Sequence, residues 1–145
     1  MKKIKIYIAG HNGMVGKAIH KYLITNKIGT IITATRKKLN LENINKVDKF
    51  IKKNKPDVII NCAGKVGGIL ANNNFPTEFL NENIEIQTNL IKSSYLNKVE
   101  HFINLGSSCI YPKYSKQPIK ESYLLTGSLE KTNEAYSLAK IVGLK

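Results

Sequence analysis

The stretch AGHNGMVG, residues 9–16, separates a short apolar run from an amphipathic one, and it decides how the fold is read. Its glycines, Gly10, Gly13 and Gly16, follow the spacing GxxGxxG. Such a turn bends the chain tightly, lets backbone amides approach an anion and lets the next helix pack closely on the strand. Because a helix N-terminus attracts negative charge, the turn predicts a site for dinucleotide phosphates. A plain strand-to-helix turn is the alternative.

The segments around this turn alternate between strand-like and helix-like patterns. We predict strands at residues 4–9, 30–35, 57–64 and 101–108, and helices at residues 13–23, 43–55, 76–96 and 132–145. Ile84, Ile86, Leu90 and Ile91 are the expected inner residues of the third helix. Regular alternation indicates an α/β fold, a Rossmann-type doubly wound parallel sheet with helices on both faces. The longest irregular segment, residues 108–131, is of a length that is usually functional or mobile.

Composition fits one soluble domain spanning residues 1–145, with 42% hydrophobic and 23% charged residues. No apolar run approaches the ~20 residues of a membrane helix. Cys62 and Cys109 are too few for a disulfide framework or a metal site, so we expect a protein of the reducing cytoplasm without metal. The net charge of +13 comes from scattered lysines. Nucleic-acid binding is therefore a distant alternative.

The end of the second predicted strand indicates which dinucleotide is bound. NAD-binding turns usually have an acidic residue about 20 residues after the glycines. Here the chain reads Thr35-Arg36-Lys37-Lys38, and no acid appears before Glu42. A guanidinium suits a 2′-phosphate, so we predict NADP(H) with Arg36 as the phosphate ligand. A surface cation without this role is the alternative.

A third junction, NCAG, follows the third predicted strand at Asn61. Ligands of open α/β sheets bind at the carboxyl ends of the strands. Gly64, Gly67 and Gly68 keep the following backbone free of side chains, as a loop beside a cofactor requires. A structural loop is again the alternative.

Acid–base chemistry is indicated near the end of the chain, where Tyr136 and Lys140 are four residues apart on a predicted helix. A nearby ammonium favours a phenolate, which would bring the pKa of Tyr136 toward neutral pH. Ser107, at the end of the fourth predicted strand, is placed to hold a carbonyl oxygen. The Tyr–Lys spacing alone is a weak signal, but combined with the glycine turn, NCAG and this serine it becomes strong.

Together these motifs resemble the extended short-chain dehydrogenase/reductase superfamily and, within it, the GDP-L-fucose synthase family. The segments that carry the resemblance are AGHNGMVG, KVGGILANN, GSSCIYPK, QPIKESYLLTG and TNEAYSLAKIVGLK. The resemblance implies a GDP-4-keto-6-deoxy-D-mannose 3,5-epimerase/4-reductase. Such an enzyme epimerises the carbons beside a ketone and then reduces that ketone with NADPH.

The resemblance also implies residue roles. Tyr136 would donate the proton to the keto oxygen, and Lys140 would bind the nicotinamide ribose. Ser107 would hold the keto oxygen and the enolate, and Cys109 would be the acid–base residue of epimerisation. The implied cofactor-binding residues are Gly10, His11, Asn12, Gly13, Met14, Val15, Gly16, Arg36, Ala63, Gly64, Leu105, Gly106 and Lys140.

Members of this family are longer, so the chain resembles their N-terminal part. We therefore expect an incomplete Rossmann domain, without the substrate domain or the histidine partner of Cys109, and no turnover by the chain alone. His11, His20 and His101 do not match that histidine. The family further implies a nucleotide-sugar substrate and a homodimer at full length. A separately encoded second half and a non-catalytic NADP-binding fragment are the alternatives.

Overall fold

The computed structural model describes residues 3–145 and divides into two compact units. Unit 1 comprises the described residues up to Gly64 together with Glu85–Leu105. Unit 2 comprises Lys65–Ile84 and Gly106–Lys145. The chain passes from unit 2 back into unit 1 inside one long helix, α4, which spans Pro76–Leu96. Both units therefore contain segments that are distant in sequence.

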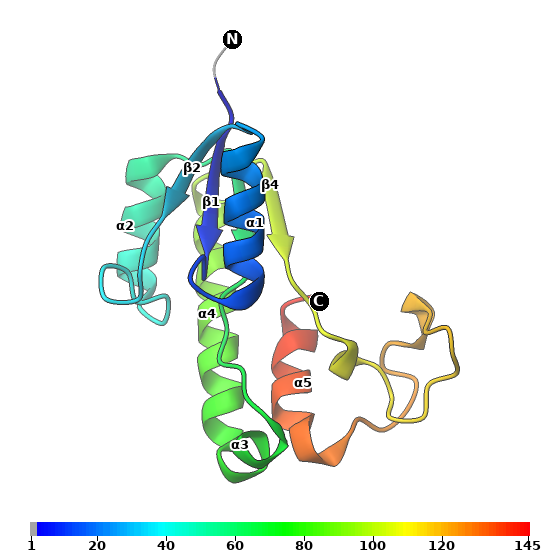
Figure 1. The fold of residues 1–145 in the computed structure, drawn as a ribbon. Coiled ribbons are helices and arrows are strands. Elements are labelled where there is room, and N and C mark those ends of the chain that lie inside the picture. Colours follow the sequence, from blue (N-terminus) through cyan, green and yellow to red (C-terminus); the bar gives the residue numbers. More distant parts are fainter. Residues whose placement is uncertain (1–2) are drawn as a thin grey trace. The chain divides into compact units, whose positions relative to one another are not determined.

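Unit 1 is built on a four-stranded parallel sheet with the order β2-β1-β3-β4 (Figure 1). The strands are β1 (Lys5–Ala9), β2 (Thr30–Thr33), β3 (Val58–Asn61) and β4 (His101–Asn104). In this register Ile8, Ile60 and Ile103 lie side by side across the sheet. The predicted parallel α/β sheet is confirmed. The first strand ends at the predicted residue, and the other three end before the predicted residues.

The two faces of the sheet carry different helices, because successive strand residues point to opposite sides. Tyr7 and Ile59 face α2 (Ile44–Asn54) and α4, and Ile6 and Ile8 face α1 (Met14–Thr25) (Figure 1). Complete burial of one such side chain contributes about 1.5–3 kcal/mol. These two apolar clusters fix the strand ends from which the loops of unit 1 emerge.

The long helix α4 begins and ends at the predicted residues, Pro76 and Leu96. Ile86 and Leu90 are buried against the sheet as expected, and Ile84 is partly buried. The prediction for Ile91 was wrong, because 36% of its surface is exposed. Ile91 follows Leu90 directly, and one residue turns a helix by about 100°, which takes its side chain off the inner face.

Unit 2 contains little regular structure beyond its helices. They are α3 (Ile69–Asn74), the first part of α4 and α5 (Glu134–Val142), with short 3₁₀ turns η1 (Ser108–Ile110), η2 (Glu121–Tyr123) and η3 (Lys131–Asn133). A small apolar cluster is formed by Ile110, Leu129 and Ile141. The irregular segment around it is joined by an ion pair of 2.8 Å between Lys113 Nζ and Glu130 Oε2.

The helix α3 was not predicted, since the sequence GG followed by several asparagines indicated a loop. Its first turn is closed by the buried Asn72, whose Nδ2 donates to the carbonyl oxygens of Gly67 and Gly68 at 2.9 and 3.1 Å. An asparagine inside a short helix is locally unfavourable, and the hydrogen bonds of its side chain offset that cost.

Candidate functional site

The glycine turn after β1 has the geometry of an anion site. Gly10 has a φ of 77°, a left-handed conformation that favours glycine, and its carbonyl oxygen accepts from Gly13 N at 3.0 Å. Gly13 then begins α1 as an extended N-cap that makes no side-chain capping bond. The first amides of α1 are therefore available to a negatively charged group.

The three glycines differ in how much space surrounds them. A methyl group on Gly10 would lie 2.7 Å from the backbone of Ala63, and one on Gly16 would lie 2.2 Å from the carbonyl oxygen of Gly10. Gly13 is open, with the same oxygen 3.4 Å away. Gly10 and Gly16 are thus required by packing within unit 1. Gly13 is not, so its missing side chain leaves room for a ligand.

Asn61 joins the ends of two strands beside this turn. Its Nδ2 donates to Asn104 Oδ1 at 2.9 Å, and its Oδ1 accepts from Ala63 N at 3.1 Å. Only 1% of its surface is exposed, so the side chain shapes the NCAG turn from inside. The backbone of Ala63 is thereby held against Gly10, while Leu105 N donates to Asn61 O at 3.3 Å.

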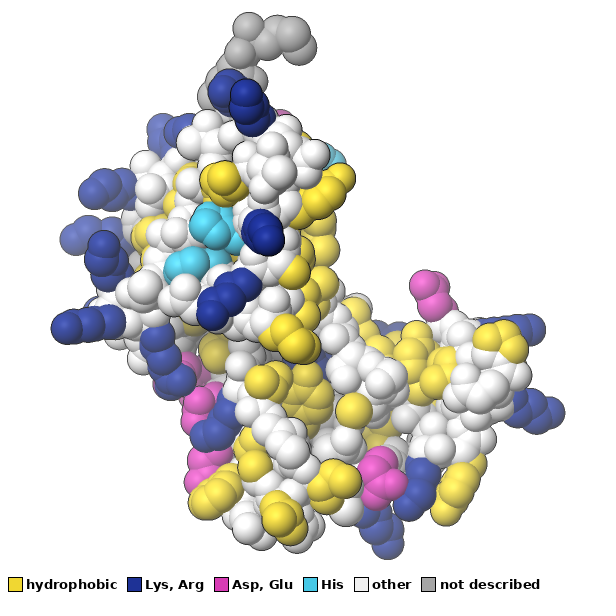
Figure 2. All heavy atoms as spheres, in the orientation of Figure 1, with side chains coloured by type: hydrophobic (Ala, Val, Ile, Leu, Met, Phe, Trp, Pro, Cys, Tyr) yellow, Lys and Arg dark blue, Asp and Glu magenta, His cyan; other side chains and the backbone are white. Residues whose placement is uncertain are grey.

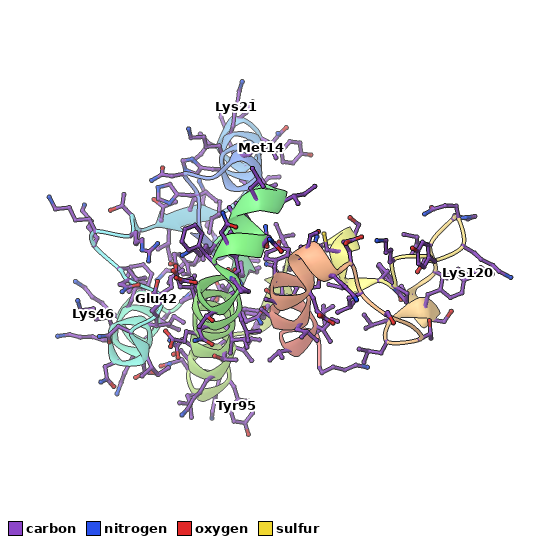
Figure 3. The ribbon with its side chains drawn as sticks, turned by 90° about the horizontal axis from the view of Figure 1, so that it is seen from below. Met14, Lys21, Glu42, Lys46, Tyr95 and Lys120 are labelled. Carbon is purple, nitrogen blue, oxygen red and sulfur yellow. The ribbon has the colours of Figure 1, made fainter. Side chains whose placement is uncertain are left out.

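The side chains of the turn are mostly exposed. Met14 is 87% exposed at the first position of α1, and Figure 3 shows it together with Lys21 on this helix. Asn12 and Val15 are also exposed. The ring of His11 meets that of His20 edge-on at 6.0 Å, and its partial burial, followed by the charge of His20, lowers the pKa of His11. His11 is therefore neutral near neutral pH.

Arg36 follows β2 at the surface, where 72% of its side chain is exposed. Its Nη2 lies 2.6 Å from Glu42 Oε1, an ion pair that sequence reasoning missed. The loop itself is fixed, because Asn40 Oδ1 accepts from Glu42 N at 3.1 Å and Asn89 of α4 donates to Leu41 O at 3.0 Å. On the face shown in Figure 2, other cationic side chains lie on unit 1 and add to a positive field.

In unit 2, the predicted acid–base residues lie together. Ser107 is extended, its Oγ accepts from Cys109 N at 3.3 Å, and its side chain lies near enough to Tyr136 to lower the pKa of that phenol. Lys140 lies one turn further along α5, with Nζ 5.9 Å from the centre of the Tyr136 ring. Lys140 is itself buried. Four residues from two distant segments thus form one cluster.

The pKa of Tyr136 is raised, which corrects the expectation that Lys140 brings it toward neutral pH. Burial is the largest cause, because a half-buried phenolate loses hydration. The hydrogen bond with Ser107 acts in the opposite direction, and negative charge on Cys109 raises the pKa of Tyr136 further. The phenol of Tyr136 is therefore protonated near neutral pH.

Sequence reasoning also missed Asn133, which lies in unit 2 beside the candidate acid–base cysteine. Its Nδ2 is 3.2 Å from Cys109 Sγ. Asn133 lies only three residues before Tyr136 in the sequence. Nothing in the local sequence pattern indicates that the Asn133 side chain reaches Cys109. Such a contact depends on how the irregular segment folds back onto α5.

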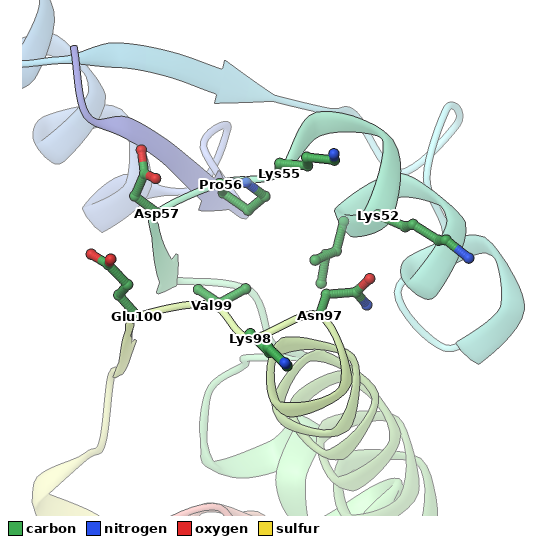
Figure 4. A pocket seen from close by; sticks show the side chains of 9 residues that line it. Lys52, Lys55, Pro56, Asp57, Asn97, Lys98, Val99 and Glu100 are labelled. Carbon is green, nitrogen blue, oxygen red and sulfur yellow. The ribbon is translucent and has the colours of Figure 1, made fainter. Parts of the chain in front are cut away.

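A cavity of about 350 Å³ lies at the amino ends of the strands of unit 1 (Figure 4). It is bordered by Asp57 and Glu100, which precede β3 and β4, and by the lysines Lys52, Lys55 and Lys98. The candidate turn follows the carboxyl ends of the strands, so this cavity is separate from it. Its mixed charges select no particular ligand.

Residues 3–145 contain no cluster of three or more His, Cys, Asp or Glu side chains that could hold a metal ion. Within the same residues, no helix is long and apolar enough to cross a membrane.

Residues 6–145 match the NAD dependent epimerase/dehydratase family. The chain belongs to this family. The match to this epimerase/dehydratase family extends over both units, so the glycine turn and the Tyr136 cluster fall within one family pattern.

Among the curated members of this family, the GDP-L-fucose synthase of Sinorhizobium fredii is 50% identical over 97% of this chain. The GDP-L-fucose synthase of Escherichia coli is 46% identical over 100% of it. In each comparison the chain covers 45% of the relative. A solved GDP-mannoheptose C4 reductase from Campylobacter jejuni with NADP bound has a TM-score of 0.93 and 38% identity, over 99% of this chain and 45% of that one.

Proposed function

We propose that this chain supplies the NADPH-binding turn and the acid–base residues of a GDP-4-keto-6-deoxy-D-mannose 3,5-epimerase/4-reductase, which forms GDP-L-fucose. The observation that carries the proposal is the cluster of Ser107, Cys109, Tyr136 and Lys140 in unit 2. Relatives 46% and 50% identical to the chain are named GDP-L-fucose synthases, which supports this substrate among those of the family.

The described residues of unit 1 fit the cofactor. The N-terminus of α1 carries no side-chain cap, and Gly13 leaves it open to a pyrophosphate. Arg36 fits a 2′-phosphate, which would take the place of Glu42 as an anionic partner of the guanidinium. Because the Arg36–Glu42 pair is exposed, separating it costs only about 0.2–1 kcal/mol.

Reduction needs a proton donor at the keto oxygen. NADPH, when bound, supplies the hydride for the keto carbon. Tyr136 donates the proton, since burial keeps its phenol protonated. Ser107 donates a hydrogen bond to the same oxygen as negative charge develops there. Lys140, one helical turn from Tyr136, binds the nicotinamide ribose and holds its ammonium over the ring.

Epimerisation needs a base for the acidic protons on the carbons beside the keto group. Cys109, as a thiolate, removes such a proton and becomes a thiol. Inversion then needs an acid that protonates the opposite face of the enolate, the role that the family resemblance gives to a histidine that His11, His20 and His101 do not match. The enolate that forms has its charge on the keto oxygen, where Ser107 and Tyr136 donate hydrogen bonds. The same oxygen-binding groups therefore serve both reactions.

A C4 reductase without epimerase activity is the second candidate, favoured by the similarity to the GDP-mannoheptose C4 reductase. Reduction alone needs only the proton donor, Tyr136. The presence of Cys109 as a second candidate acid–base residue, held by Asn133, therefore favours the epimerase.

Hydrogen exchange distinguishes the two candidates. The chain is joined to the part of the Sinorhizobium fredii GDP-L-fucose synthase that lies outside the matched region, giving what we call the joined enzyme. It is incubated in D₂O with GDP-4-keto-6-deoxy-D-mannose and without NADPH. We expect deuterium at both carbons beside the keto group, seen by mass spectrometry and NMR, and GDP-L-fucose after NADPH is added. Reduction without prior exchange would establish the reductase alone, and neither reaction would contradict the proposal.

A further inference from the structure

The side chain of Asn133 connects the candidate acid–base cysteine to α5. Asn133 ends η3 and is the N-cap residue of α5, and its Nδ2 is 3.2 Å from Cys109 Sγ. Sulfur is a weak acceptor when it is a thiol and a stronger one when it is a thiolate. The strength of this contact therefore depends on the protonation state of Cys109.

The Asn133 amide also contacts Ser137. The Oγ of Ser137 donates to the backbone oxygen of Asn133 at 3.0 Å and lies 3.4 Å from its Oδ1. Ser137 is completely buried one turn into α5, so this hydroxyl has a fixed position. In this arrangement Oδ1 lies beside Ser137 Oγ and Nδ2 faces Cys109 Sγ. The amide thus presents a hydrogen-bond donor to the sulfur.

We propose that Asn133 is a positioning residue that orients the sulfur of Cys109 and stabilises the negative charge that forms on it during proton transfer. A hydrogen bond donated to the charged form stabilises that form. The inference rests on the proposed role of Cys109 in epimerisation and adds the group that prepares it.

The same arrangement connects the two reactions. Negative charge on Cys109 raises the pKa of Tyr136, so a thiolate at residue 109 keeps the neighbouring phenol protonated. When Cys109 has lost its proton, Tyr136 therefore keeps its own. Asn133, by stabilising the negative charge on Cys109, supports this arrangement.

The test measures the alkylation of the 145-residue chain by iodoacetamide as a function of pH, with each cysteine followed by mass spectrometry. The plateau rate at high pH reports access, and the pH of half-maximal rate reports thiolate formation. In Asn133→Ala we expect that midpoint for Cys109 to rise by roughly one pH unit, because the variant lacks the hydrogen bond that stabilises the charged sulfur. Ser137→Ala should give a smaller rise, and Cys62 in unit 1 should keep its profile.

An unchanged midpoint in Asn133→Ala would overturn the proposal, and a lowered one would show that the thiol donates to Oδ1 instead. If this variant unfolds, Cys62 becomes reactive as well, and Asn133→Leu, which is of similar size, uncharged and without a donor, decides the question by the same rise. Because no cofactor or sugar is present, failure here leaves the proposed function standing. Absence of deuterium exchange in the joined enzyme, with the midpoint shift observed, would instead remove only the catalytic role of Cys109.

Discussion

The two units of this chain build their candidate sites in different ways. In unit 1 the candidate site consists mainly of backbone, because Gly10 and Gly16 pack where no side chain fits and Gly13 leaves the helix amides open. In unit 2 it consists of side chains, with Tyr136 and Cys109 held by hydrogen bonds from neighbouring residues. Unit 1 should therefore be most sensitive to added atoms, and unit 2 to removed functional groups.

The largest effect should follow from changing a reacting group in unit 2. Cys109→Ser in the joined enzyme replaces the thiol with a much weaker acid. Deuterium exchange beside the keto group should fall by about 10²–10⁴, the usual contribution of a positioned acid–base group. Calorimetric titration should give an unchanged Kd for NADPH, since unit 1 is untouched. A weakened NADPH affinity of similar size would break the division between the units.

Adding one methyl group should separate the packing glycine of unit 1 from the open one. Gly16→Ala places a Cβ 2.2 Å from the Gly10 carbonyl oxygen, and the free energy of unfolding should fall by about 3 kcal/mol. Gly13→Ala meets that oxygen at 3.4 Å, so it should change stability little and weaken NADPH binding instead. Urea unfolding and NADPH titration check both. Equal destabilisation by the two substitutions would contradict this account of the turn.

Arg36 is the side chain of unit 1 expected to select the cofactor. Arg36→Ala should weaken NADPH binding by roughly 10- to 100-fold, the value of a charge-assisted hydrogen bond, and leave NADH binding nearly unchanged. Glu42→Gln is the matched control, because it removes the competing carboxylate 2.6 Å away and should strengthen NADPH binding slightly. Equal affinities of the unaltered chain for NADPH and NADH would exclude the NADP assignment.

The smallest effect concerns a tyrosine of unit 1 that has a structural role. Burial raises the pKa of Tyr7, so the folded chain keeps a proton that the unfolded chain loses above about pH 10. Its contribution is complete below that pH and is lost as pH rises, by about 1.4 kcal/mol per pH unit.

Tyr7→Phe retains the ring contact with Phe50 at 4.9 Å and should reduce this slope in alkaline urea unfolding. Tyr95→Phe, at a position 82% exposed, should leave the slope unchanged. An unaltered slope in Tyr7→Phe would show that the phenol of Tyr7 does not resist ionisation in the folded chain.

The sequence pattern was sufficient for most of unit 1. Periodic apolar residues set the strands and the bounds of α4, and the glycine spacing located the turn. From the sequence, Glu42 was interpreted only as an acidic residue too far after β2 to bind a ribose. In the structure the loop held by Asn40 brings Glu42 to Arg36.

Unit 2 was less predictable because its contacts are not periodic. Motifs were sufficient to select Ser107, Tyr136 and Lys140 as candidate acid–base residues. The spacing of these residues did not indicate the burial that raises the pKa of Tyr136. The contact between Asn133 and Cys109 joins residues 24 positions apart through an irregular segment. Asn72 likewise closes α3 by side-chain bonds that a helix pattern does not contain.

The most direct test of the central claim is NADPH oxidation by the joined enzyme on GDP-4-keto-6-deoxy-D-mannose, compared with its Tyr136→Phe variant. We expect the unaltered chain to consume NADPH and form GDP-L-fucose. The variant should bind NADPH equally well but reduce the substrate about 10²–10⁴ more slowly, since it lacks the proton donor. A Tyr136→Phe variant that reduces the substrate at the full rate would contradict the assignment of unit 2 as the acid–base site.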